Sequence, residues 1–124
     1  MAELSSNDYA YVGDAVVELL VRRRIVSGET RVKHPFDEAV KYVSAAAQSD
    51  ALSRIEEELT EEEADVYRRA RNNYHTSNVP KSATPLQYRR STGFEAVFGY
   101  LYLKGETRRI EKLFDIAYGH EHKN

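Results

Sequence analysis

The amino-acid sequence predicts an all-helical protein, and three observations support that fold class. The 124 residues include only six glycines and three prolines, fewer than a protein of many short strands and turns would use. Apolar residues recur at helical spacing, and the strict alternation of a half-buried strand is absent. The length is that of about one domain. We therefore expect residues 1–124 to form a single helical bundle.

Capping residues set the limits of the first two expected helices. Ser5 or Ser6 can cap the first helix, which Gly28 ends. This helix covers residues 6–27, with Asp8 near the positive end of its dipole. A second helix begins at Pro35 and is expected to run to about residue 59, with a bend at residues 48–50.

Three further helices complete the predicted bundle. Thr60 and Glu63 form a capping box, which opens a helix that ends near Arg71. Residues 72–83 are polar and are expected to form a loop, longer than a simple connector. A fourth helix runs from Thr84-Pro85 to Lys104, where Gly105 ends it, and a fifth covers residues 107–118.

Composition excludes several functional classes. The chain has no cysteine, so it has no disulfide framework, thiolate metal site or cysteine nucleophile. No apolar run approaches the ~20 residues of a membrane span. The first residues lack the basic and apolar regions of a signal peptide. These features predict a cytoplasmic protein that does not enter a membrane.

The net charge of −2 hides a strong segregation of charge along the chain. Residues 50–65 hold eight acids and one arginine. No acid lies between Asp65 and Glu95, where six basic residues occur. A local basic zone of this kind is what a polyanion would contact.

Two carboxylates stand in strongly apolar helical sequence. Asp14 lies in the middle of the first helix beside Gly13, although both residues are poor helix formers and packing alone does not ask for them there. Glu95 interrupts an apolar run in the fourth helix, and Gly99 is expected to leave open space on the same face. If the two helices pack together, the acids could share a Mg²⁺ ion, which accepts one or two carboxylates. Alternatively, each acid is a rim residue or the partner of an arginine.

Several motifs resemble the ribonuclease III endonuclease domain, and most closely the short bacterial branch named Mini-ribonuclease III. Residues 11–16 (YVGDAV) resemble the family's signature helix, and residues 93–103 (GFEAVFGYLYL) resemble its second acidic helix. The other matching segments, in chain order, are YVSA at 42–45, RARN at 69–72, VPK at 79–81 and YRRSTGFEA at 88–96. The resemblance covers nearly the whole chain and leaves no residues for a double-stranded-RNA-binding domain.

The resemblance implies a homodimeric, all-helical enzyme that hydrolyses double-stranded RNA with Mg²⁺. Its implied substrate is precursor large-subunit (23S) ribosomal RNA, cut to leave 5′-phosphate and 3′-hydroxyl ends. Asp14 and Glu95 match the two acids that bind the metal and carry catalysis. Tyr11 matches an aromatic residue at the family's dimer interface, although it could also be an ordinary core residue.

The sequence departs from the full-length ribonuclease III pattern at several acidic positions. Ala10 and Asn7 stand where the signature helix of that pattern has two further acids, and Thr92 stands where its second acidic helix has an aspartate. The acid of the intervening helix aligns with Ala45 or Ala46. Two of the usual acids remain, as is typical of the Mini-ribonuclease III branch.

The basic zone is the expected RNA-binding surface. Phosphates of a duplex accept contacts from cationic and polar side chains with little regard to sequence. The candidate residues are Arg71, Asn72, His75, Lys81, Arg89 and Arg90. Arg68 and Arg69 could instead pair with the acids before them.

Glu18 has two interpretations, of which an ion pair with Arg22 is favoured over a contact with metal-bound water.

Two other protein classes also remain open: a non-catalytic RNA-binding helical module, and a structural helical dimer whose basic loop binds a protein. Salt-sensitive binding to duplex RNA would separate the enzyme and the RNA-binding module from the structural dimer. Mg²⁺-dependent cleavage would separate the enzyme from both.

Overall fold

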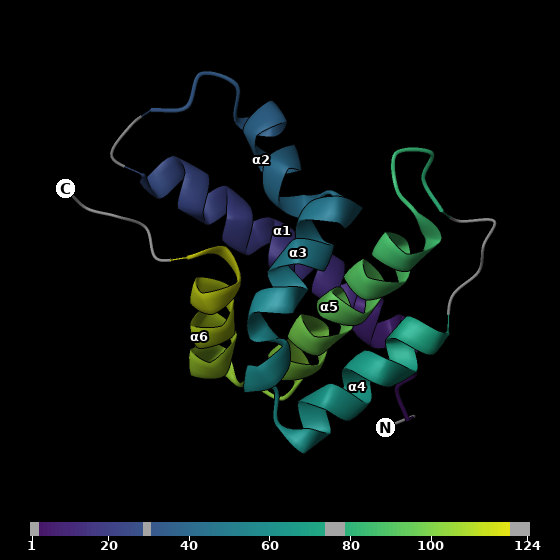
Figure 1. The fold of residues 1–124 in the computed structure, drawn as a ribbon. Coiled ribbons are helices and arrows are strands. Elements are labelled where there is room, and N and C mark those ends of the chain that lie inside the picture. Colours follow the sequence, from purple (N-terminus) through teal and green to yellow (C-terminus); the bar gives the residue numbers. More distant parts are fainter. Residues whose placement is uncertain (1–2, 29–30, 74–78, 120–124) are drawn as a thin grey trace.

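The structure, a computed structural model, is a bundle of helices, and it describes residues 3–28, 31–73 and 79–119. Within these ranges there are six α-helices, one short 3₁₀ turn and no strand, as the sequence predicts (Figure 1). The elements are α1 (Ser6–Ser27), α2 (Pro35–Val43), α3 (Ala45–Ile55), η1 (Glu56–Glu58), α4 (Glu61–Asn72), α5 (Pro85–Leu103) and α6 (Thr107–Tyr118).

Most predicted helix limits are confirmed, and the caps explain them. Ser5 caps α1 through a capping box with Asp8. Thr60 and Glu63 form the predicted capping box of α4. Thr84 caps α5, with Pro85 as its first residue.

The expected second helix is wrong in its length. The helix is interrupted at Ser44, between α2 and α3, and residues 48–50 continue α3 without a bend. Ser44 has extended backbone angles (φ −61°, ψ 155°), and its hydroxyl accepts a hydrogen bond from the amide of Ala47 at 3.2 Å. A serine in this role satisfies a free amide at the start of a new helix. The two helices can therefore pack in different directions.

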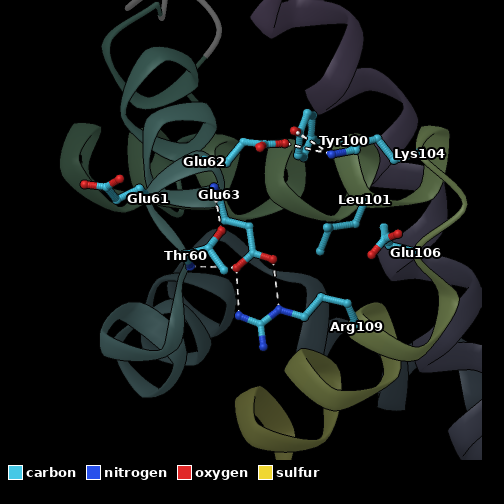
Figure 2. A pocket seen from close by; sticks show the side chains of 9 residues that line it. All are labelled: Thr60, Glu61, Glu62, Glu63, Tyr100, Leu101, Lys104, Glu106 and Arg109. Atoms are coloured by element: carbon cyan, nitrogen blue, oxygen red, sulfur yellow. Dashed lines mark hydrogen bonds and ion pairs between the residues drawn. The ribbon is translucent and has the colours of Figure 1, made fainter.

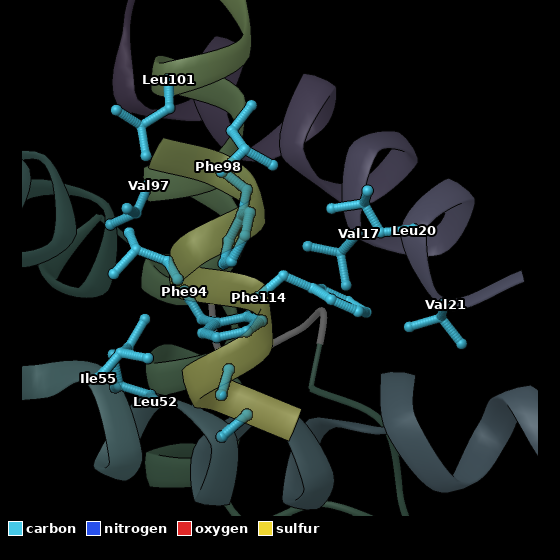
Figure 3. Close-up of a cluster of buried hydrophobic side chains, with 14 of the residues drawn as sticks. Val17, Leu20, Val21, Leu52, Ile55, Phe94, Val97, Phe98, Leu101 and Phe114 are labelled. Carbon is cyan, nitrogen blue, oxygen red and sulfur yellow. The ribbon is translucent and has the colours of Figure 1, made fainter. Parts of the chain in front are cut away.

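Helix α5 is central, because it contacts α1, α3, α4 and α6. Phe94, Val97 and Phe98 are completely buried on it, and they meet Val17 of α1 and Leu52 of α3 in the main core (Figure 3). Removing a side chain of this kind from water stabilises the fold by roughly 1.5–3 kcal/mol. The core thus fixes α1 and α3 against α5, the arrangement on which the candidate site depends.

A salt bridge between Glu63 and Arg109 joins α4 to α6. Glu63 is 4% exposed, and Arg109 donates to both of its carboxylate oxygens at 2.8 Å (Figure 2). Burial opposes ionisation of Glu63, but hydrogen bonds from Arg109 and Thr60, together with the charge of Arg109, lower the pKa of this carboxyl. One residue of the acid-rich stretch is therefore part of the interior.

Across the described ranges, no helix combines the length and apolar character needed to span a bilayer.

Candidate active site

Helices α1 and α5 cross backbone to backbone at two glycines. A methyl group on Gly13 would overlap the carbonyl oxygen of Glu95, and one on Gly99 would overlap the carbonyl oxygen of Tyr9. Both glycines are therefore required by packing. The expectations that packing does not ask for Gly13, and that Gly99 leaves open space, are wrong.

This crossing brings the two predicted acids together. Asp14 follows Gly13 and is exposed, whereas Glu95 is half-buried on α5. Their carboxyl groups are close enough to hydrogen-bond when one of them is protonated. The pair thus lies at the surface end of a buried contact, with Asp14 on the solvent side.

The environment of Glu95 strongly favours its protonated form. Burial, and then the neighbouring carboxylate of Asp14, raise the pKa of Glu95 to about 8. The charge of Glu18 adds to this effect, while a hydrogen bond from Gln48 opposes it. A carboxyl group held in this way is poised to exchange its proton for a cation.

Gln48 is a site residue that the sequence analysis missed. Its Nε2 donates to Oε2 of Glu95 at 3.2 Å, and the side chain is 2% exposed. The available signal was its spacing on α3, because Gln48 shares the buried face of that helix with Ala51, Leu52 and Ile55. A polar residue in such a stripe needs a buried partner.

The carboxylate oxygens at this crossing are suitable ligands for a hard divalent cation such as Mg²⁺. Asp14 and Glu95 offer carboxylate oxygens, and Mg²⁺ is commonly held by one or two carboxylates, with water and phosphate completing its octahedron. The described residues contain no group of three or more His, Cys, Asp or Glu that could hold a metal. Such an ion would therefore depend on water or a bound phosphate for its other ligands.

An open groove runs beside Asp14. It is lined by Tyr11, Val12, Asp14, Ala15, Val16, Glu18, Leu19 and Tyr102. Glu18 lies there with its Oε2 3.6 Å from Nε of Arg22, in the favoured ion pair. Asp14 and Glu18 thus face this groove, whereas Glu95 is not among the residues that line it.

Tyr11 lies on the rim of this groove and is 83% exposed. The interpretation of Tyr11 as an ordinary core residue is therefore wrong. Leu19 and Tyr102, at 67% and 58% exposed, extend the same apolar surface.

The candidate RNA-binding residues differ in their exposure and in their contacts within the protein. Lys81 and Asn72 are exposed, and Arg71 and Arg89 are half-buried. They lie near the end of α4 and the start of α5, which face the same side of the molecule (Figure 1). His75 falls outside the described residues. Arg68 and Arg69, as considered, pair with Asp65.

Arg90 is engaged inside the protein. Its Nε donates to Oγ of Ser49 at 2.8 Å, and its Nη2 donates to Oγ of Ser53 at 2.6 Å. A further ion pair reaches Glu56 at 3.8 Å. The sequence marked Arg90 as a candidate for phosphate contact, but in the structure its guanidinium joins α5 to α3.

Comparison with known proteins agrees with this fold. The family model described as "Ribonuclease III domain" matches residues 7–106. A crystal structure of a protein from Fusobacterium nucleatum has a TM-score of 0.83 and 28% identity, covering 92% of this chain and 87% of that one. The class that the fold and the family model define is the ribonuclease III domain.

Sequence relatives narrow the class further. "Mini-ribonuclease 3" of Symbiobacterium thermophilum is 45% identical over 109 residues, covering 87% of this chain and 83% of that protein. The protein of the same name from Thermoanaerobacter sp. is 42% identical, covering 87% and 76%. This chain belongs to the ribonuclease III family, in its Mini-ribonuclease III branch, and is an endoribonuclease. The family acts on double-stranded RNA.

Proposed function

We propose that this enzyme cleaves double-stranded regions of precursor 23S ribosomal RNA with Mg²⁺ bound by Asp14 and Glu95. The observation that carries the proposal is the crossing of α1 and α5 at Gly13 and Gly99, which sets these two carboxyl groups side by side. The proposed substrate is a primary transcript, so the proposal also places the enzyme in the cytoplasm. In this proposal residues 1–124 form one catalytic unit.

The proposed reaction is hydrolysis of a phosphodiester bond. Water adds to phosphorus and the bond to the 3′ oxygen breaks, so the products are a 5′-phosphate and a 3′-hydroxyl that takes up a proton. Bound Mg²⁺ would supply charge neutralisation at the phosphate and acidify a water molecule. Asp14 and Glu95 would hold the ion and, through it, orient the attacking water.

RNA binding is assigned to the basic zone near the end of α4 and the start of α5. Lys81 and Asn72 are exposed, and Arg71 and Arg89 flank them. In the proposal these residues, together with His75, contact backbone phosphates, whereas Arg90 ties α5 to α3. Because double-stranded RNA is recognised mostly by shape, such contacts would position the duplex without reading its sequence.

We further propose a homodimer that uses the apolar groove of α1. Tyr11, Ala15 and Leu19 are four residues apart, so they share one exposed helix face, and Tyr102 lies beside them. Exposed apolar surface of this kind often marks a contact between proteins. A two-fold dimer would present two sites, one for each strand of the duplex.

The test of this function is cleavage of a long RNA duplex, followed on a gel with Mg²⁺ or with a chelator. We expect the wild type to cleave the duplex with Mg²⁺ and not with the chelator. Asp14→Asn and Glu95→Gln should lose cleavage by at least about 100-fold and keep RNA binding, because they remove charge without changing size. A matched Asp115→Asn variant, altered at an acid on α6, should cut normally. If either site variant cuts at the wild-type rate, the assigned site is wrong.

A non-catalytic RNA-binding module is the second candidate retained from the sequence. It predicts salt-sensitive binding to the duplex by all these proteins and no Mg²⁺-dependent cleavage by any of them. The same gel, run beside a binding assay, separates the two.

A further inference from the structure

Gln48 is a buried amide that the proposed reaction does not yet use. It lies on α3 with 2% of its surface exposed, among apolar residues of the main core. A primary amide loses its hydrogen bonds to water on burial, so an apolar residue would suit this position better unless the amide has a partner. Its partner is Glu95, whose Oε2 accepts from Nε2 at 3.2 Å.

The hydrogen bond restrains a flexible side chain. Glutamate has three rotatable side-chain bonds, and a fixed donor at one oxygen selects the orientation of the whole carboxyl group. The donor reaches Glu95 from α3, and Asp14 meets the same group from α1. Glu95 is therefore held between two helices that the core fixes against α5.

Helix α3 is itself tied to α5 beside Gln48. Arg90 donates to the side-chain and main-chain oxygens of Ser49, at 2.8 and 3.1 Å. Ser49 directly follows Gln48, and Arg90 lies on the helix that carries Glu95. This contact limits how far the amide of Gln48 can move relative to Glu95.

We propose that Gln48 is a positioning residue, which holds the carboxylate of Glu95 in the orientation that binds the divalent cation beside Asp14. The inference rests on the proposed function and deepens it. Gln48 acts through Glu95 and contacts neither the cation nor the RNA. Residues behind metal ligands in other proteins typically change metal affinity or activity by roughly 10–100-fold when they are replaced.

The test compares Gln48→Met with wild type by titrating Mn²⁺ and counting free ion by electron paramagnetic resonance. Methionine keeps the length and burial of glutamine but cannot donate to Glu95. We expect Mn²⁺ affinity to fall about 10-fold or more, with the Mg²⁺ needed for half-maximal cleavage rising in parallel and the KM for RNA unchanged. Leu52→Met, a change one turn along the same buried face, should leave Mn²⁺ affinity unchanged.

A second measurement uses the wild-type protein, so it does not depend on the variant folding. The side-chain amide signal of Gln48 in a nitrogen-15 spectrum should be protected from solvent exchange. It should also shift with Mg²⁺ at the same midpoint as the backbone amide of Glu95. Rapid exchange and no shift at saturating Mg²⁺ would overturn the proposal.

The outcomes separate this inference from the proposed function. Wild type that binds Mn²⁺ and a folded Gln48→Met that binds it equally well would overturn the role of Gln48 and leave the cation site standing. Wild type that binds no Mn²⁺ would overturn the cation site, and the role of Gln48 with it. Equal weakening by Leu52→Met would show that packing of α3, and not the hydrogen bond, sets the affinity.

Discussion

Glu95 is placed between a second carboxyl group and an amide. Asp14 and burial favour its protonated form, and the hydrogen bond from Gln48 favours its ionised form. The balance leaves the pKa of Glu95 raised to about 8, so in the absence of a cation it carries a proton at neutral pH. A divalent cation would reverse this balance, because its charge stabilises both carboxylates.

The raised pKa predicts how stability depends on pH in a chelator. Between the ordinary value of 4.5 and about 8, the unfolded chain has released a proton that the folded protein retains. The folded state then binds more protons, so the free energy of unfolding falls as pH rises through this window. Glu95→Gln cannot ionise and should lose this part of the decline. Melting temperatures of both proteins from about pH 5 to about pH 8 check it, and identical profiles would contradict the assignment.

At the scale of elements, the crossing of α1 and α5 depends on the absence of a side chain at Gly13. Gly13→Ala places a methyl group against the backbone carbonyl of Glu95, which cannot rotate away. We expect a loss of about 3 kcal/mol in unfolding free energy. Cleavage should also fall in the fraction that folds, because Asp14 and Glu95 would separate.

Gly93→Ala is the matched control on α5. Its new methyl group would meet the ring of Tyr67 first and would come no closer than 3.0 Å to a backbone atom, the carbonyl oxygen of Tyr67. We expect a smaller loss of stability and near-normal cleavage. Equal losses in chemical denaturation for the two variants would show that the crossing is not specially constrained.

Arg90 gives a second test at this scale. Its hydrogen bonds to Ser49 and Ser53 predict that Arg90→Met lowers unfolding free energy by about 1–2 kcal/mol.

Lys81 is exposed, so Lys81→Ala should leave the melting temperature unchanged and reduce the salt slope of duplex RNA binding by about one. Arg23→Ala, on a remote ion pair with Glu111, serves as the control. A lower salt slope for Arg90→Met without loss of stability would favour a phosphate contact.

The sequence predicts the elements well where local chemistry determines them. The capping box at Thr60 and the cap at Thr84 with Pro85 after it lie within three residues of each helix start, so they can be recognised without the fold. The break at Ser44 was missed, because a serine within helix-forming sequence caps a new helix only when the backbone turns there.

The sequence predicted only part of the site, because some of its contacts depend on how the helices pack. Asp14 and Glu95 stood out as acids in apolar sequence, and the structure brings them together. Gln48 and the direction of Arg90 depend on how α3 packs on α5, which no local pattern contains. The role of Gly13 was also hidden, because a glycine in a helix shows its purpose only beside the helix that crosses it.

At the scale of the whole molecule, the exposed face of α1 predicts assembly. Light scattering at micromolar protein should report about twice 14.2 kDa. Tyr11→Asp places a charge in the proposed interface and should give the monomer mass. Phe36→Asp changes a residue that is similarly exposed, at 74%, but lies on α2 outside the groove, so it should leave the dimer intact. A monomeric wild type, or dissociation by Phe36→Asp alone, would contradict the proposed interface.

The central claim is that the crossing of α1 and α5 creates a cation site between Asp14 and Glu95. Anomalous diffraction from crystals soaked in Mn²⁺ tests it most directly, because Mn²⁺ takes the oxygen ligands that suit Mg²⁺. The account predicts an anomalous peak within coordination distance of both carboxylates, and no such peak in crystals of Glu95→Gln. A peak elsewhere in the wild type, or none at saturating Mn²⁺, would contradict it.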